Sequence, residues 1–387
     1  MADRIIYLDH AATTPLDPEV LAAMMPYLTE QFGNPSSIHR AGRAALDGAR
    51  DTVARALGAL PKEIIFTGGG SEADNLAVKG VALAQRRAGR GAHVITSAIE
   101  HHAVLHAVEW LQALGFEATV LPVDGDGLVR PEDLSAAIRP DTVLASIMYA
   151  NNEIGTVQPL AELGAICRGR GVPLHTDAVQ APGSLPLDVG ALNVDLMTIA
   201  AHKFYGPKGV GALYVRRGTP LMPLISGGGQ ERRLRAGTEN VAGIVGLAAA
   251  LRAAEERRPQ YVAHCAALRD RLVAGVLEQI SGAALNGHPT SRLPNNASIA
   301  FDDVEGESVL LLLDQQGIAA SSGSACTSGS LEASHVLLAL GLPHERALGA
   351  VRFSVGRSTT GADVEALLAV LPGAIERLRA VAVGAGG

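Results

Sequence analysis

Cysteine is scarce in this chain of 387 residues, which contains only Cys167, Cys265 and Cys326. Their wide spacing excludes a disulfide scaffold and a zinc cage, and it favours a reducing compartment. Long apolar runs are also missing, because the longest window, 241–251, is too short to cross a bilayer. The start, MADRIIYLDHAATTP, lacks the features of a signal peptide. We therefore expect a cytoplasmic protein with no membrane partner.

An excess of basic charge is absent as well. The 32 lysines and arginines are outnumbered by 39 acidic residues, which gives a formal net charge of −7. Proteins that bind nucleic acid usually present a basic face, and the only dense basic patch here is Arg232, Arg233 and Arg235. We therefore expect no nucleic-acid partner. The composition, with 48% hydrophobic and 18% charged residues, is that of a globular protein.

Short apolar runs alternate with helical patterns through the first 250 residues. The predicted strands cover 63–67, 92–97, 142–149, 172–177, 195–200 and 211–216, and the clearest helices cover 71–88 and 101–114. This alternation predicts an α/β fold with a mostly parallel sheet and helices on both faces. In such sheets, ligands bind at the carboxyl ends of the strands.

The last third of the chain has a different pattern. A long helical stretch covers 241–280, and the remainder mixes strands at 297–301 and 351–355 with helices at 307–315 and 362–380. Because 387 residues are many for one core, we predict two domains. The large ligand-binding domain would comprise 16–255. The smaller α+β domain would comprise 1–15 and 256–387.

Three segments follow predicted strands and carry polar groups. The first, TGGGSEADN at 67–75, could hold an anion at a helix N-terminus, or it could be a tight turn with Ser71 as the N-cap. The second, LHTDAVQ at 174–180, places Asp177 at a strand end, where it could contact a ligand or cap a helix. The third, AAHKFYGPKG at 200–209, contains Lys203, whose partial burial would suit it to Schiff-base chemistry. Lys208, in a Gly-Pro-Lys-Gly turn, reads instead as a surface lysine.

Two further segments carry a possible nucleophile and a group of histidines. SSGSACTSGS at 321–330 consists of small uncharged residues, which predicts a mobile loop with an accessible Cys326. Cys167 and Cys265 lie in alanine-rich helical contexts and are expected to be buried. In EHHAVLH at 100–106, His102 and His106 have the spacing of a metal pair, but no carboxylate ligands accompany them, and His101 is the better functional candidate.

Together these motifs resemble the cysteine desulfurases, a group of class V aminotransferase-like, fold-type I enzymes that use pyridoxal 5'-phosphate (PLP). The resemblance runs from YLDHAATTP at 7–15 to RSTT at 357–360, nearly the whole chain. It is closest to the iron–sulfur-cluster and nitrogen-fixation enzymes, because the long loop SSGSACTSGS followed by Leu331 and Glu332 is typical of that group.

The resemblance implies a role for each matching residue. Lys203 would carry PLP, Asp177 would bind the pyridine nitrogen, Gln180 would donate to the phenolic oxygen, and His101 would stack on the ring. The phosphate would be held by Gly70, Ser71 and His202, and by Thr238 of the neighbouring subunit, which implies a homodimer. The substrate carboxylate would be held by Asn152 and Arg352.

The implied reaction converts L-cysteine to L-alanine. Cys326 would receive the sulfur as a persulfide and pass it to an acceptor, such as an iron–sulfur scaffold protein. The rival readings are another fold-type I PLP enzyme, such as an aminotransferase or a selenocysteine lyase, and a non-catalytic sulfur carrier. Two departures from the family pattern stand out: Ala200 replaces a phosphate-binding serine, and little chain follows the last helix, where relatives carry a scaffold-docking extension.

Overall fold

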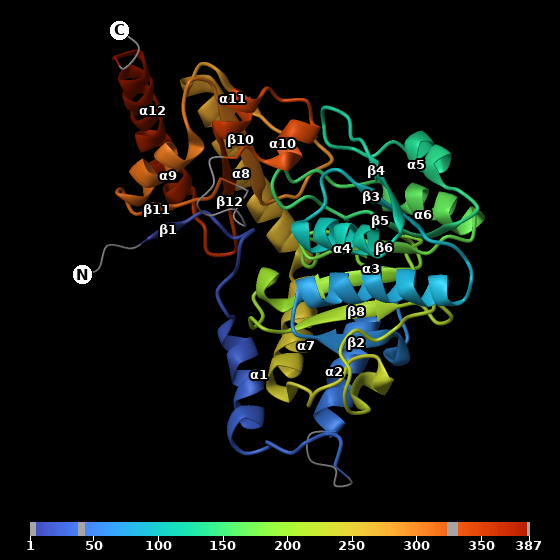
Figure 1. Cartoon of the computed structure of the whole chain (residues 1–387). Helices are drawn as coiled ribbons and strands as arrows, with labels where there is room; N and C mark the ends of the chain where they lie inside the picture. Colours follow the sequence, from blue (N-terminus) through green and yellow to red (C-terminus); the bar gives the residue numbers. More distant parts are fainter. Residues whose placement is uncertain (1–4, 38–42, 323–331, 385–387) are drawn as a thin grey trace.

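The computed structural model describes residues 5–37, 43–322 and 332–384. Its main sheet has seven strands (Figure 1). In spatial order they are β2 (Ile64–Thr67), β8 (Gly211–Val215), β7 (Leu196–Ala200), β6 (Leu174–Asp177), β5 (Thr142–Ser146), β3 (His93–Ser97) and β4 (Glu117–Leu121). Every pairing is parallel except those of β8, which runs antiparallel to both β2 and β7. The predicted, mostly parallel sheet is confirmed.

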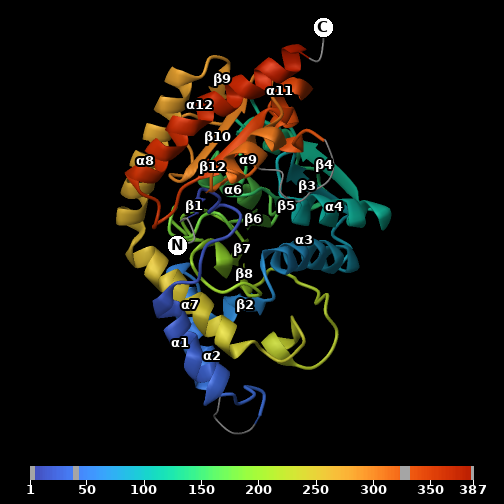
Figure 2. The same cartoon turned by 90° about the vertical axis from the view of Figure 1, so that its left-hand side faces the viewer.

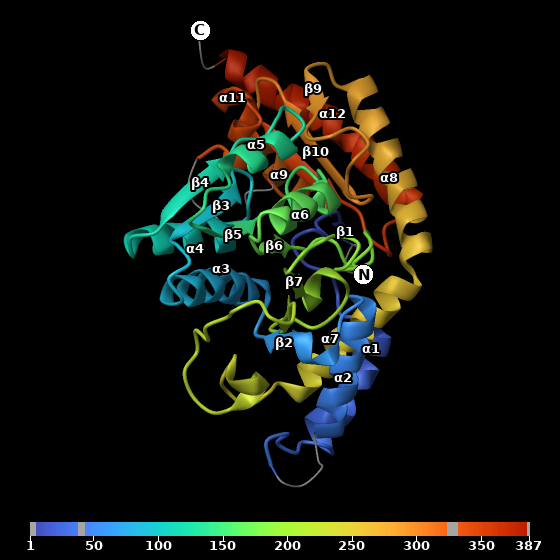
Figure 3. The same cartoon turned by 90° about the vertical axis from the view of Figure 1, so that its right-hand side faces the viewer.

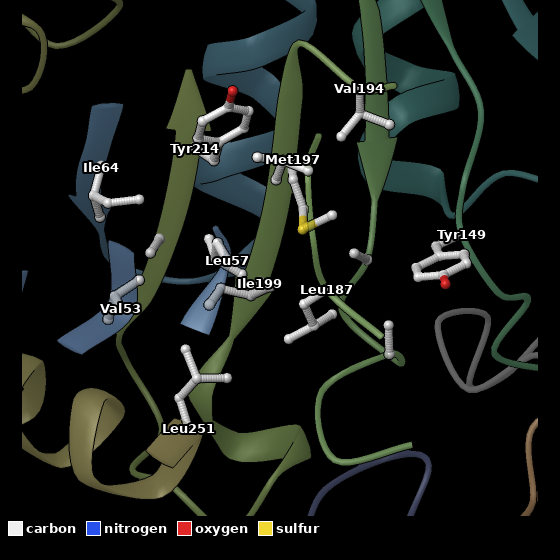
Figure 4. Close-up of a cluster of buried hydrophobic side chains, with 14 of the residues drawn as sticks. Val53, Leu57, Ile64, Tyr149, Leu187, Val194, Met197, Ile199, Tyr214 and Leu251 are labelled. Atoms are coloured by element: carbon white, nitrogen blue, oxygen red, sulfur yellow. The ribbon is translucent and has the colours of Figure 1, made fainter. Parts of the chain in front are cut away.

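Side chains alternate between two cores on the two faces of this sheet. Phe66 and Tyr214 belong to one apolar cluster, whereas their neighbours Ile65 and Leu213 belong to the other. Figure 4 shows Tyr214, Met197 and Ile199 in the first cluster. Alternation of this kind follows from the two-residue period of a strand.

Helices cover both faces of the sheet. On the face of Phe66 lie α1 (Pro18–Thr29), α2 (Arg43–Ala56), α5 (Pro131–Ala137), α6 (Leu160–Gly169) and α7 (Val241–Glu256). On the other face lie α3 (Gly70–Arg87) and α4 (His102–Ala113). Figure 3 shows α3 and α4 on the side of the sheet away from α7.

A second, smaller unit surrounds an antiparallel sheet. Its strands are, in spatial order, β12 (Ala350–Ser354), β10 (Asn296–Phe301) and β9 (Ala283–Leu285). The helices α8 (Arg258–Gln279), α9 (Gly306–Asp314) and α12 (Gly361–Gly384) pack against it (Figure 2). Two short helices, α10 (His335–Ala339) and α11 (His344–Leu348), complete this unit.

The N-terminal segment joins this second unit. β1 (Ile6–Tyr7) pairs in parallel with β11 (Ile318–Ala319), and Leu8 is buried in the same apolar cluster as α8 and α12. The sequence therefore predicted the α+β character of this region correctly. The domain limits at residues 15 and 255 stay a prediction.

The prediction of one long helical stretch over 241–280 is wrong in one respect. The structure has two helices here, since α7 ends at Glu256 and α8 begins at Arg258. Pro259, in the first turn of α8, has no N–H group to donate to the carbonyl of Glu255, so the hydrogen-bond ladder stops there. Strand β4 was not predicted, because Glu117 and Val120 are exposed and no continuous apolar run marks this edge strand.

Three further expectations concern single residues and helices. Cys167 and Cys265 are buried free thiols, as predicted, and Lys208 is exposed. No helix in the described part of the chain is long and apolar enough to span a bilayer.

Candidate active site

A cavity of about 360 Å³ opens at the carboxyl ends of β5, β6 and β7, where the two units meet. Polar groups from eight places in the sequence converge on it. Nine of the predicted site residues line it: Gly70, Ser71, His101, Asn152, Asp177, Gln180, His202, Lys203 and Arg352.

Lys203 enters the cavity from the turn that follows β7. This strand ends at Ala200, and a short 3₁₀ helix, η2 (Ala201–Lys203), presents the lysine. The Nζ atom donates to the carbonyls of Ala11 and Ala12, both at 2.7 Å. These carbonyls come from the N-terminal segment, so the position of the amine depends on chain segments about 190 residues apart in sequence.

Asp177 ends β6 and is 7% exposed. Its Oδ1 accepts a hydrogen bond from the N–H of Val179 at 2.9 Å within a turn, and no helix follows, so the expectation that Asp177 could cap a helix is wrong. Burial raises the pKa of Asp177, although the hydrogen bond from Val179 and the nearby His101 and Lys203 oppose this effect. Asp177 forms no salt bridge within the described residues, and a cationic ligand group beside it would balance its charge.

The N-terminus of α3 forms another wall of the cavity. The N-cap is Gly69 rather than Ser71, so the prediction of Ser71 as the N-cap is wrong. Gly69 has φ 155° and ψ −179°, a conformation that only glycine adopts readily. Helix α3 therefore begins at Gly70, and Ser71 in its first turn is left exposed at the cavity. A Cβ atom at Gly70 would lie 3.0 Å from Cγ2 of Val179, so this position leaves little room for a side chain.

His101 is the N-cap of α4. Its Nδ1 accepts a hydrogen bond from the N–H of Ala103 at 3.1 Å, which favours the tautomer protonated at Nε2. Burial lowers the pKa of His101, as does the charge of Lys203, whereas Asp177 opposes the shift. Burial also lowers the pKa of His202 to about 4. Both rings are therefore neutral at pH 7.

Arg352 on β12 is the cationic group on the opposite wall. It is 2% exposed, its Nη2 donates to Oδ1 of Asp9 at 2.7 Å, and its Nη1 donates to the carbonyl of Asn152 at 2.9 Å. The Nε atom has no hydrogen-bond partner in the described part of the chain. The guanidinium is thus held in place beside the cavity, and each Nη atom has a second hydrogen that can be donated to a ligand carboxylate.

Two predicted site residues, Thr238 and Cys326, are not among the described residues that line this cavity. Thr238 is exposed and is not among the lining residues. Cys326 lies outside the described residues. His102 and His106 have ring centroids 5.0 Å apart, yet no metal-binding cluster of histidine, cysteine and carboxylate groups exists within the described ranges.

Comparison with known proteins identifies the family. Residues 6–367 match the family Aminotransferase class-V. Cysteine desulfurase IscS of Methanosarcina thermophila is 53% identical over 380 residues, which cover 97% of this chain and 93% of that protein. The chain belongs to the class-V aminotransferases, in their cysteine desulfurase group. The predicted family resemblance and fold class are confirmed.

Two solved structures have the same fold. A NifS-like protein aligns with a TM-score of 0.90 and 38% identity, over 96% of this chain and 100% of that one. A structure titled SspA in complex with cysteine aligns with a TM-score of 0.79 and 36% identity, over 92% of this chain and 99% of that one. The conservation of backbone shape therefore covers both units of this desulfurase-group chain.

Sequence reasoning missed three acidic residues of this cysteine desulfurase-group cavity. Asp74, Glu100 and Glu153 line it, and their exposed fractions are 1%, 0% and 6%. Asp74 and Glu100 lie inside motifs that the sequence did single out, next to residues with expected roles. Nothing in the local pattern distinguishes a buried acid from one at the surface, because burial depends on distant segments.

Proposed function

We propose that the chain is a cysteine desulfurase that converts L-cysteine to L-alanine and transfers the sulfur to Cys326 as a persulfide. One observation carries this proposal: an amine, a buried carboxyl and a guanidinium, from Lys203, Asp177 and Arg352, border the same cavity. These are the groups needed to bind an aldehyde cofactor, its ring nitrogen and an amino-acid carboxylate.

The donor set fits PLP. Lys203 would hold the cofactor covalently and Asp177 its ring nitrogen, while Gln180 and His101 would contact the ring. The first turn of α3, with Gly70 and Ser71, and His202 would hold the phosphate, since a helix N-terminus binds anions. Bound PLP would supply an electron sink for the electron pair that remains on the substrate Cα when its proton is removed. The volume of about 360 Å³ lies in the usual range for small-molecule sites.

Each side chain then has a task toward L-cysteine. Arg352 would grip the substrate carboxylate through two parallel hydrogen bonds, with Asn152 beside it. Lys203, once the substrate amine has taken its place, would accept the Cα proton at Nζ. The uncharged His101, with its proton on Nε2, would pack against the cofactor and leave the negative charge of Asp177 unopposed by a second cation.

Cys326 would be the sulfur acceptor, and the ends of its segment support this assignment. Ser321 exchanges two backbone hydrogen bonds with Arg352, while His335 and Val336 line the cavity on the far side of the segment. Cys326 follows Ser321 by five positions in the sequence, a distance that the chain can span over at most roughly 18 Å. The thiol therefore lies within chain reach of the substrate.

Partners and assembly form the rest of the proposal. An acceptor protein, such as an iron–sulfur scaffold, would take the persulfide sulfur in the cytoplasm. The exposed Thr238 would reach the phosphate in a second copy of the chain, which makes the enzyme a homodimer. The division into 16–255 and the two segments 1–15 and 256–387 would let the small unit carry the Cys326 segment over the large one.

The test combines colour, trapping and product analysis. Purified protein with PLP should be yellow, and borohydride should fix the cofactor on Lys203. Addition of L-cysteine should yield alanine and, with a reducing thiol, sulfide. The Cys326→Ser variant should keep the colour and lose sulfide release, whereas Cys167→Ser and Cys265→Ser, as controls at buried thiols, should keep both.

Three outcomes would contradict the proposal. Sustained sulfide release by Cys326→Ser would identify a different nucleophile. Turnover that needs an α-keto acid and releases no sulfide would indicate an aminotransferase. A protein that stays colourless with PLP would be a sulfur carrier without catalysis.

A further inference from the structure

Glu100 is a buried acid in the cavity to which the proposed reaction assigns no task. It lies between the end of β3 and the start of α4 and is 0% exposed. Its Oε1 accepts two hydrogen bonds, from Oγ of Ser97 at 2.5 Å and from the N–H of Met148 at 2.9 Å. These bonds fix the carboxyl between the ends of β3 and β5.

The second oxygen of this carboxyl is in a different situation. Oε2 of Glu100 is buried and has no hydrogen-bond partner among the described residues, and Glu100 is one of the residues that line the cavity. A buried polar oxygen without a partner costs free energy, unless a ligand or a water molecule supplies the missing bond. Because Glu100 borders the cavity, a ligand bound there can supply this bond.

Among the described residues, no cationic side chain forms a hydrogen bond or a salt bridge with the carboxyl of Glu100. Asp74 on α3 and Asp177 on β6 are both carboxyls, and each interacts electrostatically with Glu100. His335 meets only the backbone carbonyl of Glu100, at 3.0 Å, and burial lowers the pKa of this histidine, as it does for His101. An ionised Glu100 would therefore be a buried charge with no directly bonded counter-ion in the part of the chain that the structure describes, next to a second carboxylate.

We propose that Glu100 is held as a neutral carboxylic acid and that its Oε2 hydroxyl donates a hydrogen bond to an oxygen of the ligand in the cavity. Asp177 is then the carboxylate that balances the cationic ring of the cofactor, and Glu100 adds a donor without adding charge. Burial raises the pKa of Glu100 to about 8, against the opposing hydrogen bonds from Ser97 and Met148. The contact with the ligand rests on the proposed function, whereas the neutral state does not.

The neutral state is tested on the protein without cofactor. Infrared spectra should show the carbonyl stretch of a protonated carboxylic acid at pH 7, and the Glu100→Gln variant should lose the Glu100 part of it. The control is Glu63→Gln, because Glu63 is also buried and accepts two backbone hydrogen bonds but lies away from the cavity. No loss of the acid band in Glu100→Gln, or a loss of carboxylate absorption in its place, would overturn the inference.

The ligand contact is tested by adding PLP to the same two proteins. The Glu100 band should move to lower frequency as the protein turns yellow, since a new hydrogen bond weakens the carbonyl. The midpoint of the pH titration of the chromophore should stay unchanged in Glu100→Gln, because the amide preserves both the neutral charge and a donor. A yellow protein with an unmoved band would refute the contact. A colourless protein would refute the proposed function, and the acid band would still decide the neutral state.

Discussion

Arg352 offers the sharpest test of how the substrate is held, through replacement by lysine. Nη2 of the guanidinium already donates a hydrogen bond to Asp9, and Nη1 donates one to the carbonyl of Asn152. The Nε atom has no hydrogen-bond partner in the described part of the chain. In the proposed complex, the carboxylate of L-cysteine would receive two parallel hydrogen bonds from the remaining donors. Lysine keeps the charge but has a single ammonium, which cannot present a planar pair of donors.

The magnitude follows from the loss of one charge-assisted hydrogen bond. Such a bond contributes about 1.5–3 kcal/mol. Since about 1.4 kcal/mol corresponds to a factor of ten, Arg352→Lys should lower kcat/KM for L-cysteine by about 10- to 150-fold. The change should appear mainly in KM, because the carboxylate is bound equally in the ground state and in the transition state. The assay measures alanine formation against L-cysteine concentration.

The control is Arg139→Lys, because Arg139 makes hydrogen bonds to Glu117 and Asp141 at the surface, away from the cavity. This variant should match the wild type, and the melting temperature of Arg352→Lys should confirm that it is folded. A folded Arg352→Lys enzyme with kcat/KM within about threefold of the wild type would show that Arg352 does not hold the substrate carboxylate. A large fall in kcat at constant KM would point to a role in the chemical step.

Three further predictions concern the cofactor, stability and pH. Ala200→Ser restores a hydroxyl beside the first turn of α3 and should tighten PLP binding about 2- to 12-fold, the equivalent of about 0.5–1.5 kcal/mol, as measured by fluorescence titration. Glu231→Gln breaks the buried salt bridge with Arg50 at 2.6 Å and should cost about 3–5 kcal/mol in denaturant unfolding, whereas Glu365→Gln at an exposed pair should leave stability unchanged. The pKa of Glu100 is raised from 4.5 to about 8 in the folded protein. The contribution of Glu100 to the free energy of unfolding is therefore fully present below pH 4.5 and is lost as the pH rises to 8. Wild-type protein without cofactor should therefore lose stability over this range relative to Glu100→Gln, by a few kcal/mol at most (roughly 1.4 per pKa unit), and a flat difference would contradict the neutral acid.

Local sequence patterns determined six of the seven strands of the main sheet, the helices α3 and α4, and the motifs at the strand ends. The six strands predicted in the first 250 residues all exist, since strands buried on both faces are short apolar runs bounded by turns. Asp177 is the last residue of β6 and Lys203 lies three residues after β7, and the carboxyl ends of neighbouring parallel strands meet at one edge of a sheet. The sequence was therefore sufficient to bring these two residues together.

Tertiary structure alone decided which groups are charged, paired or neutral. Lys203 bonds to Ala11 and Ala12, and Arg352 bonds to Asp9, across separations that no local pattern reveals. Glu100 carries no sequence signal of burial, because its partners are Ser97 at the end of β3, Met148 after β5 and His335 at the start of α10. The charge state of an acid depends on whether the folded chain removes water from it and places counter-ions beside it. Both are determined by residues that are distant in the sequence, so only the tertiary structure reveals them.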